Sequence, residues 1–139
     1  MDDVDVLPPR SAERWLQQRI LVVDDDPDSA EVVTELLAVA GHQTRFALDG
    51  PSALAIAKVF QPQLVFLDIT LAEMDGYEVA RQLRLEPGLS NVVLVALTGW
   101  SGTEWEQKAR EAGFDRYIVK PLERAALKEL LGASARMAR

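Results

Sequence analysis

The sequence predicts an α/β fold in which five parallel strands form a doubly wound sheet with helices on both faces. Short apolar runs alternate five times with segments that carry apolar residues at helical spacing. Residues 64–67 and 92–97 are unbroken apolar runs, which is typical of parallel strands covered on both faces. Connections between parallel strands are almost always right-handed, so we expect the strand order 2-1-3-4-5.

The first predicted unit is a strand at residues 20–23 followed by a helix. Asp26 can cap this helix, and Pro27 suits its first turn because an N–H there would have no partner. Helical spacing places five apolar side chains on one stripe: Val32, Val33, Leu36, Leu37 and Ala40. Gly41 is expected to end the helix.

The second unit has a strand at residues 44–47 and a helix that opens at residues 50–52. This helix is expected to end before Gln61, because the residue that precedes Pro62 avoids helical backbone angles. The remaining predicted strands are residues 64–67, 92–97 and 117–119, and the remaining helices are residues 76–85, residues 103–112 and a segment from Pro121 onward.

A chain of 139 residues with 48% hydrophobic residues is expected to bury one core and form one domain. We assign residues 19–132 to this domain, residues 1–18 to an extension or linker, and residues 133–139 to a tail. A short helix that presents Trp15 is an alternative for part of the extension.

The composition excludes several kinds of site. The chain has no cysteine, which excludes disulfides, thiolate metal cages and thiol nucleophiles. Its formal charge of -7 disfavours nonspecific attraction to nucleic acid. No apolar run approaches the roughly 20 residues of a membrane span, and the acidic amino terminus does not resemble a signal peptide. We therefore expect a cytoplasmic protein without a nucleic-acid or membrane partner.

Polar side chains follow four of the five predicted strands: Asp24 and Asp25 after the first, Asp68 after the third, Thr98 after the fourth and Lys120 after the fifth. Ligands of such sheets bind at this edge, near the switch point between strands 1 and 3. Converging carboxylates repel one another unless a proton or cation joins them. Because only oxygen ligands are available, Mg²⁺ fits this position better than zinc.

These side chains suit phosphoryl transfer. A carboxylate can attack phosphorus to form an aspartyl phosphate, while a metal ion, a lysine and a hydroxyl neutralise charge on the equatorial oxygens. Lys120 would hold one oxygen, and Thr98 would donate a hydrogen bond to another.

Four strings stand at the predicted strand ends: "ILVVDDD", "LVFLDITLAEMDGYE", "LVALTGW" and "YIVKP". Because of these four strings, the sequence resembles the receiver domains of two-component signalling over roughly residues 19–132. The resemblance implies a flavodoxin-like (βα)5 fold. One departure is Leu71-Ala72, where relatives usually carry Met-Pro. Without the proline we expect a less constrained loop and a changed phosphate lifetime.

The resemblance also implies a role for each residue of the site. Asp68 would be the phosphoacceptor, Lys120 and Thr98 would contact the phosphate, and Thr98 with Tyr117 would form the switch. The implied ligands of Mg²⁺ are Asp24, Asp25 as the principal ligand, Asp68 and the backbone carbonyl of Thr70.

The implied function is that of a signalling phosphoacceptor rather than an enzyme. A histidine kinase or histidine phosphotransfer protein would donate the phosphoryl group, and the phosphorylated form would bind a downstream protein target differently. A homodimer is a further option. A stand-alone regulator and a receiver excised from a hybrid histidine kinase both fit the sequence.

Two other functions stay open. A haloacid-dehalogenase-like phosphatase would use Asp24 as nucleophile and Asp26 as acid, although this leaves Asp68 and Lys120 partly unexplained. A pseudo-receiver would be an interaction module that never takes phosphate.

Simpler roles also remain open for individual side chains. The three aspartates at residues 24–26 could merely cap a helix, and Tyr117 could be a core aromatic. Trp100 and Trp105 could lie in an interface or cover the core. His42 is expected to be a solvated turn residue.

Overall fold

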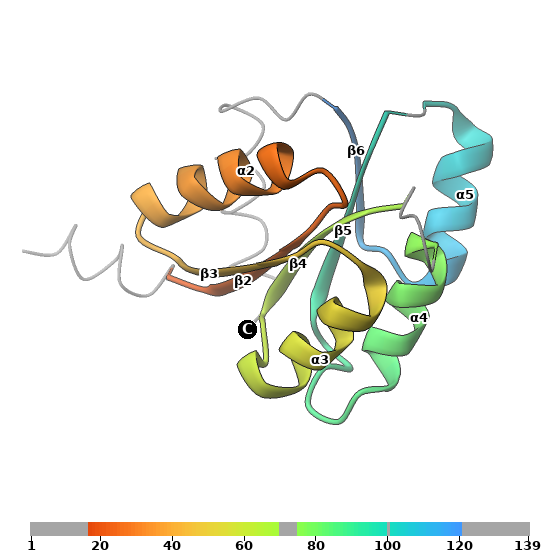
Figure 1. The fold of residues 1–139 in the computed structure, drawn as a ribbon. Coiled ribbons are helices and arrows are strands. Elements are labelled where there is room, and N and C mark those ends of the chain that lie inside the picture. Colours follow the sequence, from red (N-terminus) through yellow and green to blue (C-terminus); the bar gives the residue numbers. More distant parts are fainter. Residues whose placement is uncertain (1–16, 70–74, 100, 121–139) are drawn as a thin grey trace, which may run out of the picture.

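The computed structural model describes residues 17–69, 75–99 and 101–120. Within these ranges, five parallel strands form one sheet in the order β3-β2-β4-β5-β6, which confirms the predicted topology (Figure 1). The strands are β2 (Arg19–Val23), β3 (Gln43–Ala47), β4 (Leu64–Asp68), β5 (Val93–Thr98) and β6 (Arg116–Val119). Asp68 and Thr98, which we expected just after their strands, are the last residues of β4 and β5.

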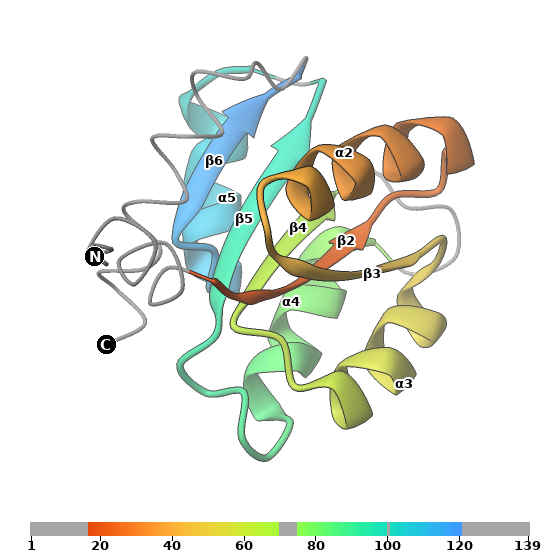
Figure 2. The same cartoon turned by 90° about the vertical axis from the view of Figure 1, so that its left-hand side faces the viewer.

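Helices cover both faces of the sheet, as a doubly wound fold requires. They are α2 (Pro27–Val39), α3 (Gly50–Phe60), α4 (Gly76–Leu85) and α5 (Thr103–Ala112). Figure 2 shows α2 on one face and α3, α4 and α5 on the other. The helix α4 contacts both α3 and α5, so these three helices form a continuous layer.

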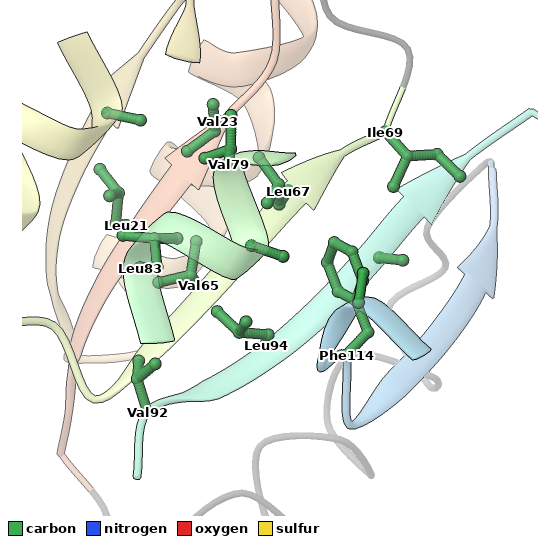
Figure 3. Packing of buried hydrophobic residues seen from close by; sticks show 14 of the residues in the cluster. Leu21, Val23, Val65, Leu67, Ile69, Val79, Leu83, Val92, Leu94 and Phe114 are labelled. Carbon is green, nitrogen blue, oxygen red and sulfur yellow. The ribbon is translucent and has the colours of Figure 1, made fainter. Parts of the chain in front are cut away.

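Alternate residues of a buried strand contribute to two different cores, because successive side chains point to opposite faces of a sheet. On β4, Val65 and Leu67 belong to the cluster beneath α3, α4 and α5 (Figure 3). Leu64 and Phe66 point the other way and join the cluster that includes residues of α2. Every residue of β4 is buried, as its unbroken apolar sequence predicted.

The helix ends follow the local sequence. The Asp26 side chain accepts a hydrogen bond from the Asp28 N–H at 3.1 Å, which confirms the predicted cap of α2. Ala40 caps the other end of α2, and Gly41 follows with φ of 100°. Gln61 ends α3 in the left-handed region, with φ of 52°, directly before Pro62.

The predicted helix from Pro121 and the expectations for Trp15, Thr70 and Trp100 lie outside the described residues. The domain boundaries stay predictions. Among the helices of the described ranges, none has the length and apolar composition needed to cross a membrane.

Candidate functional site

The carboxyl ends of β2, β4, β5 and β6 lie at one edge of the sheet, because these strands are parallel neighbours. Asp24 follows β2, and Lys120 follows β6, which is the edge strand on the far side of β5. Parallel pairing therefore brings side chains from distant stretches of sequence to the same edge. This is the convergence that the strand ends predicted.

Lys120 joins the two buried carboxylates of the site. Its Nζ lies 2.9 Å from Asp24 Oδ2 and 3.2 Å from Asp68 Oδ2. Asp24 is 6% exposed and Asp68 is 5% exposed, whereas the Lys120 side chain is 31% exposed. The lysine therefore reaches from the partly open rim of the site down to the two carboxylates.

Lys120 carries a positive charge in this arrangement. Burial alone would lower the pKa of Lys120. The hydrogen bond to Asp24 and the charges of Asp68 and Asp24 outweigh this effect, so the pKa lies above its usual value. The ammonium group is thus a fixed cation beside Asp68.

Asp25 completes a cluster of three carboxylates. One oxygen from each of Asp24, Asp25 and Asp68 lies within 4.8 Å of the other two. Asp25 is exposed while the other two are buried. Three carboxylates and one ammonium leave a formal charge of -3 + 1 = -2 at this point.

The donor set fits a hard divalent cation. The cluster offers only carboxylate oxygens, which Mg²⁺ prefers, and its surplus of two negative charges matches the charge of such an ion. Asp25 is exposed, so water can complete the coordination from the open side. The predicted Thr70 carbonyl ligand lies outside the described residues.

Both carboxylate oxygens of Asp24 accept hydrogen bonds. Oδ1 accepts a hydrogen bond from the Asp26 N–H at 3.0 Å, and Oδ2 accepts one from Lys120. The Asp26 carboxylate accepts from the Asp28 N–H as the cap of α2. In this structure both carboxylates therefore accept hydrogen bonds from the backbone at the start of α2. The simple capping role is therefore correct for Asp26.

Thr98 and Tyr117 lie on the neighbouring strands β5 and β6. Thr98 is fully buried, and its carbonyl accepts a hydrogen bond from the Lys120 N–H at 2.7 Å. Tyr117 pairs with Ala96 across β5 and β6 and is only partly buried against the core. Burial, and then the charge of Glu106, raises the pKa of Tyr117. Tyr117 is thus at the margin of the core rather than inside it.

One expectation for another side chain changes with the structure, and both alternatives for Trp105 stay open. His42 is half-buried, and its Nδ1 accepts a hydrogen bond from the Gln18 N–H at 3.0 Å, so the expectation of a solvated turn residue was wrong. Trp105 is partly buried on α5, and its ring contacts the ammonium group of Lys108.

The close approach of α4 to the end of β4 was not predicted from the sequence. A Cβ on Gly76 would lie only 2.3 Å from the Cα of Ile69. We had interpreted Gly76 only as a helix start. A glycine directly after the capping Asp75 is also typical of a place where two backbones touch, and this is the pattern that could have revealed the contact.

Comparisons with known proteins agree with this geometry. A family model described as the response regulator receiver domain matches residues 20–132. The chain is 41% identical over 108 residues to the DNA-binding response regulator MtrA of Mycolicibacterium smegmatis, covering 78% of this chain and 46% of that protein. It is 32% identical over 105 residues to the DNA-binding dual master transcriptional regulator RpaA of Synechocystis, covering 76% of this chain and 44% of that protein.

Solved structures show the same fold. The receiver domain of the sensor histidine kinase PA1611 from Pseudomonas aeruginosa, which has a magnesium ion coordinated in its active site cleft, superposes with a TM-score of 0.78 at 28% identity. The match covers 86% of this chain and 98% of that one. The chemotaxis protein CheY4 of Vibrio cholerae has a TM-score of 0.81 at 25% identity, with 85% and 98% covered.

The chain spans less than half the length of the curated relatives named here. Both of those relatives are named as DNA-binding or transcriptional regulators, so the expectation that nucleic acid is no partner is not supported. The family match covers most of the chain and includes every described strand except the first residue of β2. The chain therefore belongs to the family of response regulator receiver domains.

Proposed function

We propose that Asp68 accepts a phosphoryl group and that the new charge switches the protein's contacts with other proteins. The observation that carries this proposal is the bridge by Lys120 between Asp24 and Asp68, at 2.9 Å and 3.2 Å, beside a cluster of three carboxylates. A surplus of buried negative charge is costly to fold, so its presence at one edge of the sheet indicates a chemical task.

Asp68 is the nucleophile of the proposed reaction. One of its carboxylate oxygens bonds to phosphorus while the bond from phosphorus to a donor imidazole nitrogen breaks. The electron pair of the broken bond stays on the imidazole. The donor is a histidine kinase or a histidine phosphotransfer protein, and the product on this chain is an aspartyl phosphate.

Lys120 and Thr98 stabilise the transferred group. The Lys120 ammonium is already placed against Asp68 and would hold one phosphate oxygen. Thr98 ends the next strand and would donate its hydroxyl to another oxygen. Thr98, at the end of β5, and Tyr117, on the neighbouring strand β6, would then form the switch.

Asp24, Asp25 and Asp68 would hold Mg²⁺, together with the carbonyl of Thr70. When bound, the ion supplies positive charge that offsets the carboxylates and the phosphate oxygens. Asp25 is the most exposed of the three carboxylates and would be the principal ligand.

The signal leaves the domain through protein contacts. A downstream protein target or a second copy of the chain would distinguish the two forms by a differential affinity of a few kcal/mol. Where such a domain is joined to a DNA-binding unit, nucleic acid is reached through that unit. Apart from promoting its own phosphorylation and slow dephosphorylation, the chain is a signalling component rather than an enzyme.

Acetyl phosphate with Mg²⁺ tests the proposal. Intact-mass measurement should show one added phosphoryl group, which disappears in Asp68→Asn. The matched control is Asp49→Asn, because Asp49 is the cap of α3 and asparagine caps equally well. Labelling of Asp24 with turnover would support a phosphatase instead. A chain that folds and never takes the group would be a pseudo-receiver.

A further inference from the structure

The backbone at the start of α4 lies directly against the backbone at the end of β4. The Gly76 N–H donates a hydrogen bond to the Ile69 carbonyl at 3.2 Å. A Cβ on Gly76 would lie 2.3 Å from the Ile69 Cα and 2.7 Å from the Asp68 carbonyl oxygen. Because Gly76 has no side chain to separate the two backbones, we expect a displacement of the backbone at Asp68 and Ile69 to move the first turn of α4.

Tyr77, the next residue of α4, has an unusual environment. It is 9% exposed, and its hydroxyl is buried without a hydrogen-bond partner in the described part of the chain. Such a hydroxyl is unfavourable, because it has left water and gained no bond in exchange. Burial, then the charges of Tyr117 and Asp75, raises the pKa of Tyr77, so Tyr117 is an electrostatic neighbour.

The Tyr77 ring also contacts α5. The Lys108 Nζ lies 5.4 Å from the centroid of the Tyr77 ring and 5.4 Å from the centroid of the Trp105 ring. These distances are those of cation–π contacts. Lys108 is exposed and Trp105 is partly buried, so this pair lies at the protein surface.

We infer that Tyr77 is a positioning residue through which a phosphoryl group on Asp68 changes the Lys108–Trp105 surface of α5. This inference rests on the proposed function of Asp68. The chain of contacts runs from Asp68 and Ile69 through Gly76 to Tyr77, and from there through Lys108 to Trp105. It is distinct from the switch that the family resemblance assigns to Thr98 and Tyr117.

The unpartnered Tyr77 hydroxyl predicts how the phosphorylated and unphosphorylated forms differ. In the phosphorylated form the Tyr77 hydroxyl gains the hydrogen bond that it lacks in this structure. In Tyr77→Phe the unphosphorylated form no longer buries a hydroxyl without a hydrogen bond, so this form is stabilised. The phosphorylated form loses the hydrogen bond that the hydroxyl would make, so that form is destabilised. A residue with a merely structural role would not affect the two forms in opposite senses.

Nuclear magnetic resonance of the ¹⁵N-labelled full chain tests the inference. The assigned indole N–H signal of Trp105 is recorded before and after acetyl phosphate and Mg²⁺ are added, and the labelled fraction is measured by intact mass on the same sample. The variants are Tyr77→Phe and Lys108→Gln. The control is Lys58→Gln, because Lys58 is an exposed lysine on α3.

We expect phosphorylation to shift the Trp105 signal in the parent chain and in the Lys58→Gln control. At an equal labelled fraction, the shift should fall at least twofold in Tyr77→Phe and Lys108→Gln, while Tyr77→Phe melts no lower than the parent before labelling. A full shift in Tyr77→Phe, or an unmoved Trp105 signal in the labelled parent chain, overturns the inference alone. A parent chain without any adduct on Asp68 overturns the proposed function, and the coupling then has no input.

Discussion

Two charged regions of the molecule differ in their balance of positive and negative charge. At the carboxyl ends of the strands, three carboxylates lie close together, and one lysine contacts two of them. At the amino end of β5, Arg84 faces one carboxylate, because its Nη2 lies 2.8 Å from Asp115 Oδ2. The first region has a surplus of negative charge, whereas the second pairs one cation with one anion.

The second region also makes several hydrogen bonds to the backbone. Arg84 also donates hydrogen bonds to the carbonyls of Gly113, Ser90 and Val92, and Asp115 accepts one from the Leu94 N–H. This arginine therefore ties α4, the start of β5 and the loop before β6 together. The balanced region holds the fold, and the unbalanced region is left to bind a cation and a phosphoryl group.

The largest effect is expected from Lys120→Met. The substitution removes the cation beside Asp68, and the rate of labelling by acetyl phosphate should fall about 100-fold, as is typical when one group that stabilises the transferred charge is lost. The rate is measured by quenched intact-mass time courses. Lys58→Met serves as the control on α3, and an equal rate in Lys120→Met would contradict the role of the lysine.

Arg84→Ala should be the most destabilising change in the balanced region. It leaves several backbone carbonyls and Asp115 without their donor, at a cost of about 2–3 kcal/mol in the free energy of unfolding. Urea unfolding measures this loss. Arg81→Ala on the same helix removes only an exposed pair with Glu78 and should change stability by less than about 0.5 kcal/mol. Equal losses in both variants would show that the Arg84 contacts do not stabilise the fold.

Asp25→Asn should stabilise the fold, in contrast to Arg84→Ala. It removes one charge from the surplus, so without Mg²⁺ the free energy of unfolding should rise by about 1 kcal/mol. Binding of Mg²⁺, followed by calorimetric titration, should weaken in the same variant. If the variant is less stable and binds the ion as before, Asp25 is neither a source of repulsion nor a ligand.

His42→Gln changes a residue outside both regions and is expected to have the smallest effect. Burial lowers the pKa of His42, and its Nδ1 accepts from the Gln18 N–H. The unfolded chain therefore binds a proton more readily, so stability is complete above about pH 6.5 and is lost as the pH falls through the folded-state pKa. This is the one histidine of the chain. Urea unfolding at about pH 7.5 and about pH 5.5 should show a smaller loss in the variant, and equal losses would contradict this account.

The elements that could be predicted are those in which a local pattern determines the structure. Asp26 with Pro27 marked the start of α2, and the unbroken apolar runs marked β4 and β5. The site could be predicted too, because parallel strands deliver their last residues to one edge. The predicted strand order therefore indicated that residues far apart in the sequence lie close together.

The contacts of Arg84, Tyr77 and Gln61 could not be predicted in the same way. Arg84 looks like any arginine on the polar face of a helix, because nothing near it in sequence shows that the Gly113 carbonyl and Asp115 will be close. The left-handed backbone of Gln61 depends on its tertiary surroundings, where its amide donates to the Pro87 carbonyl. Such residues are defined by partners that only folding brings within reach.

Peptide mass spectrometry that maps the phosphoryl group, with Mg²⁺ and again with the ion chelated, shows whether Asp68 is the acceptor of a metal-dependent reaction. The crowded carboxylates predict a single adduct on Asp68 that forms only when the ion is present. An adduct on any other residue, or equal labelling of Asp68 after chelation, would contradict the account.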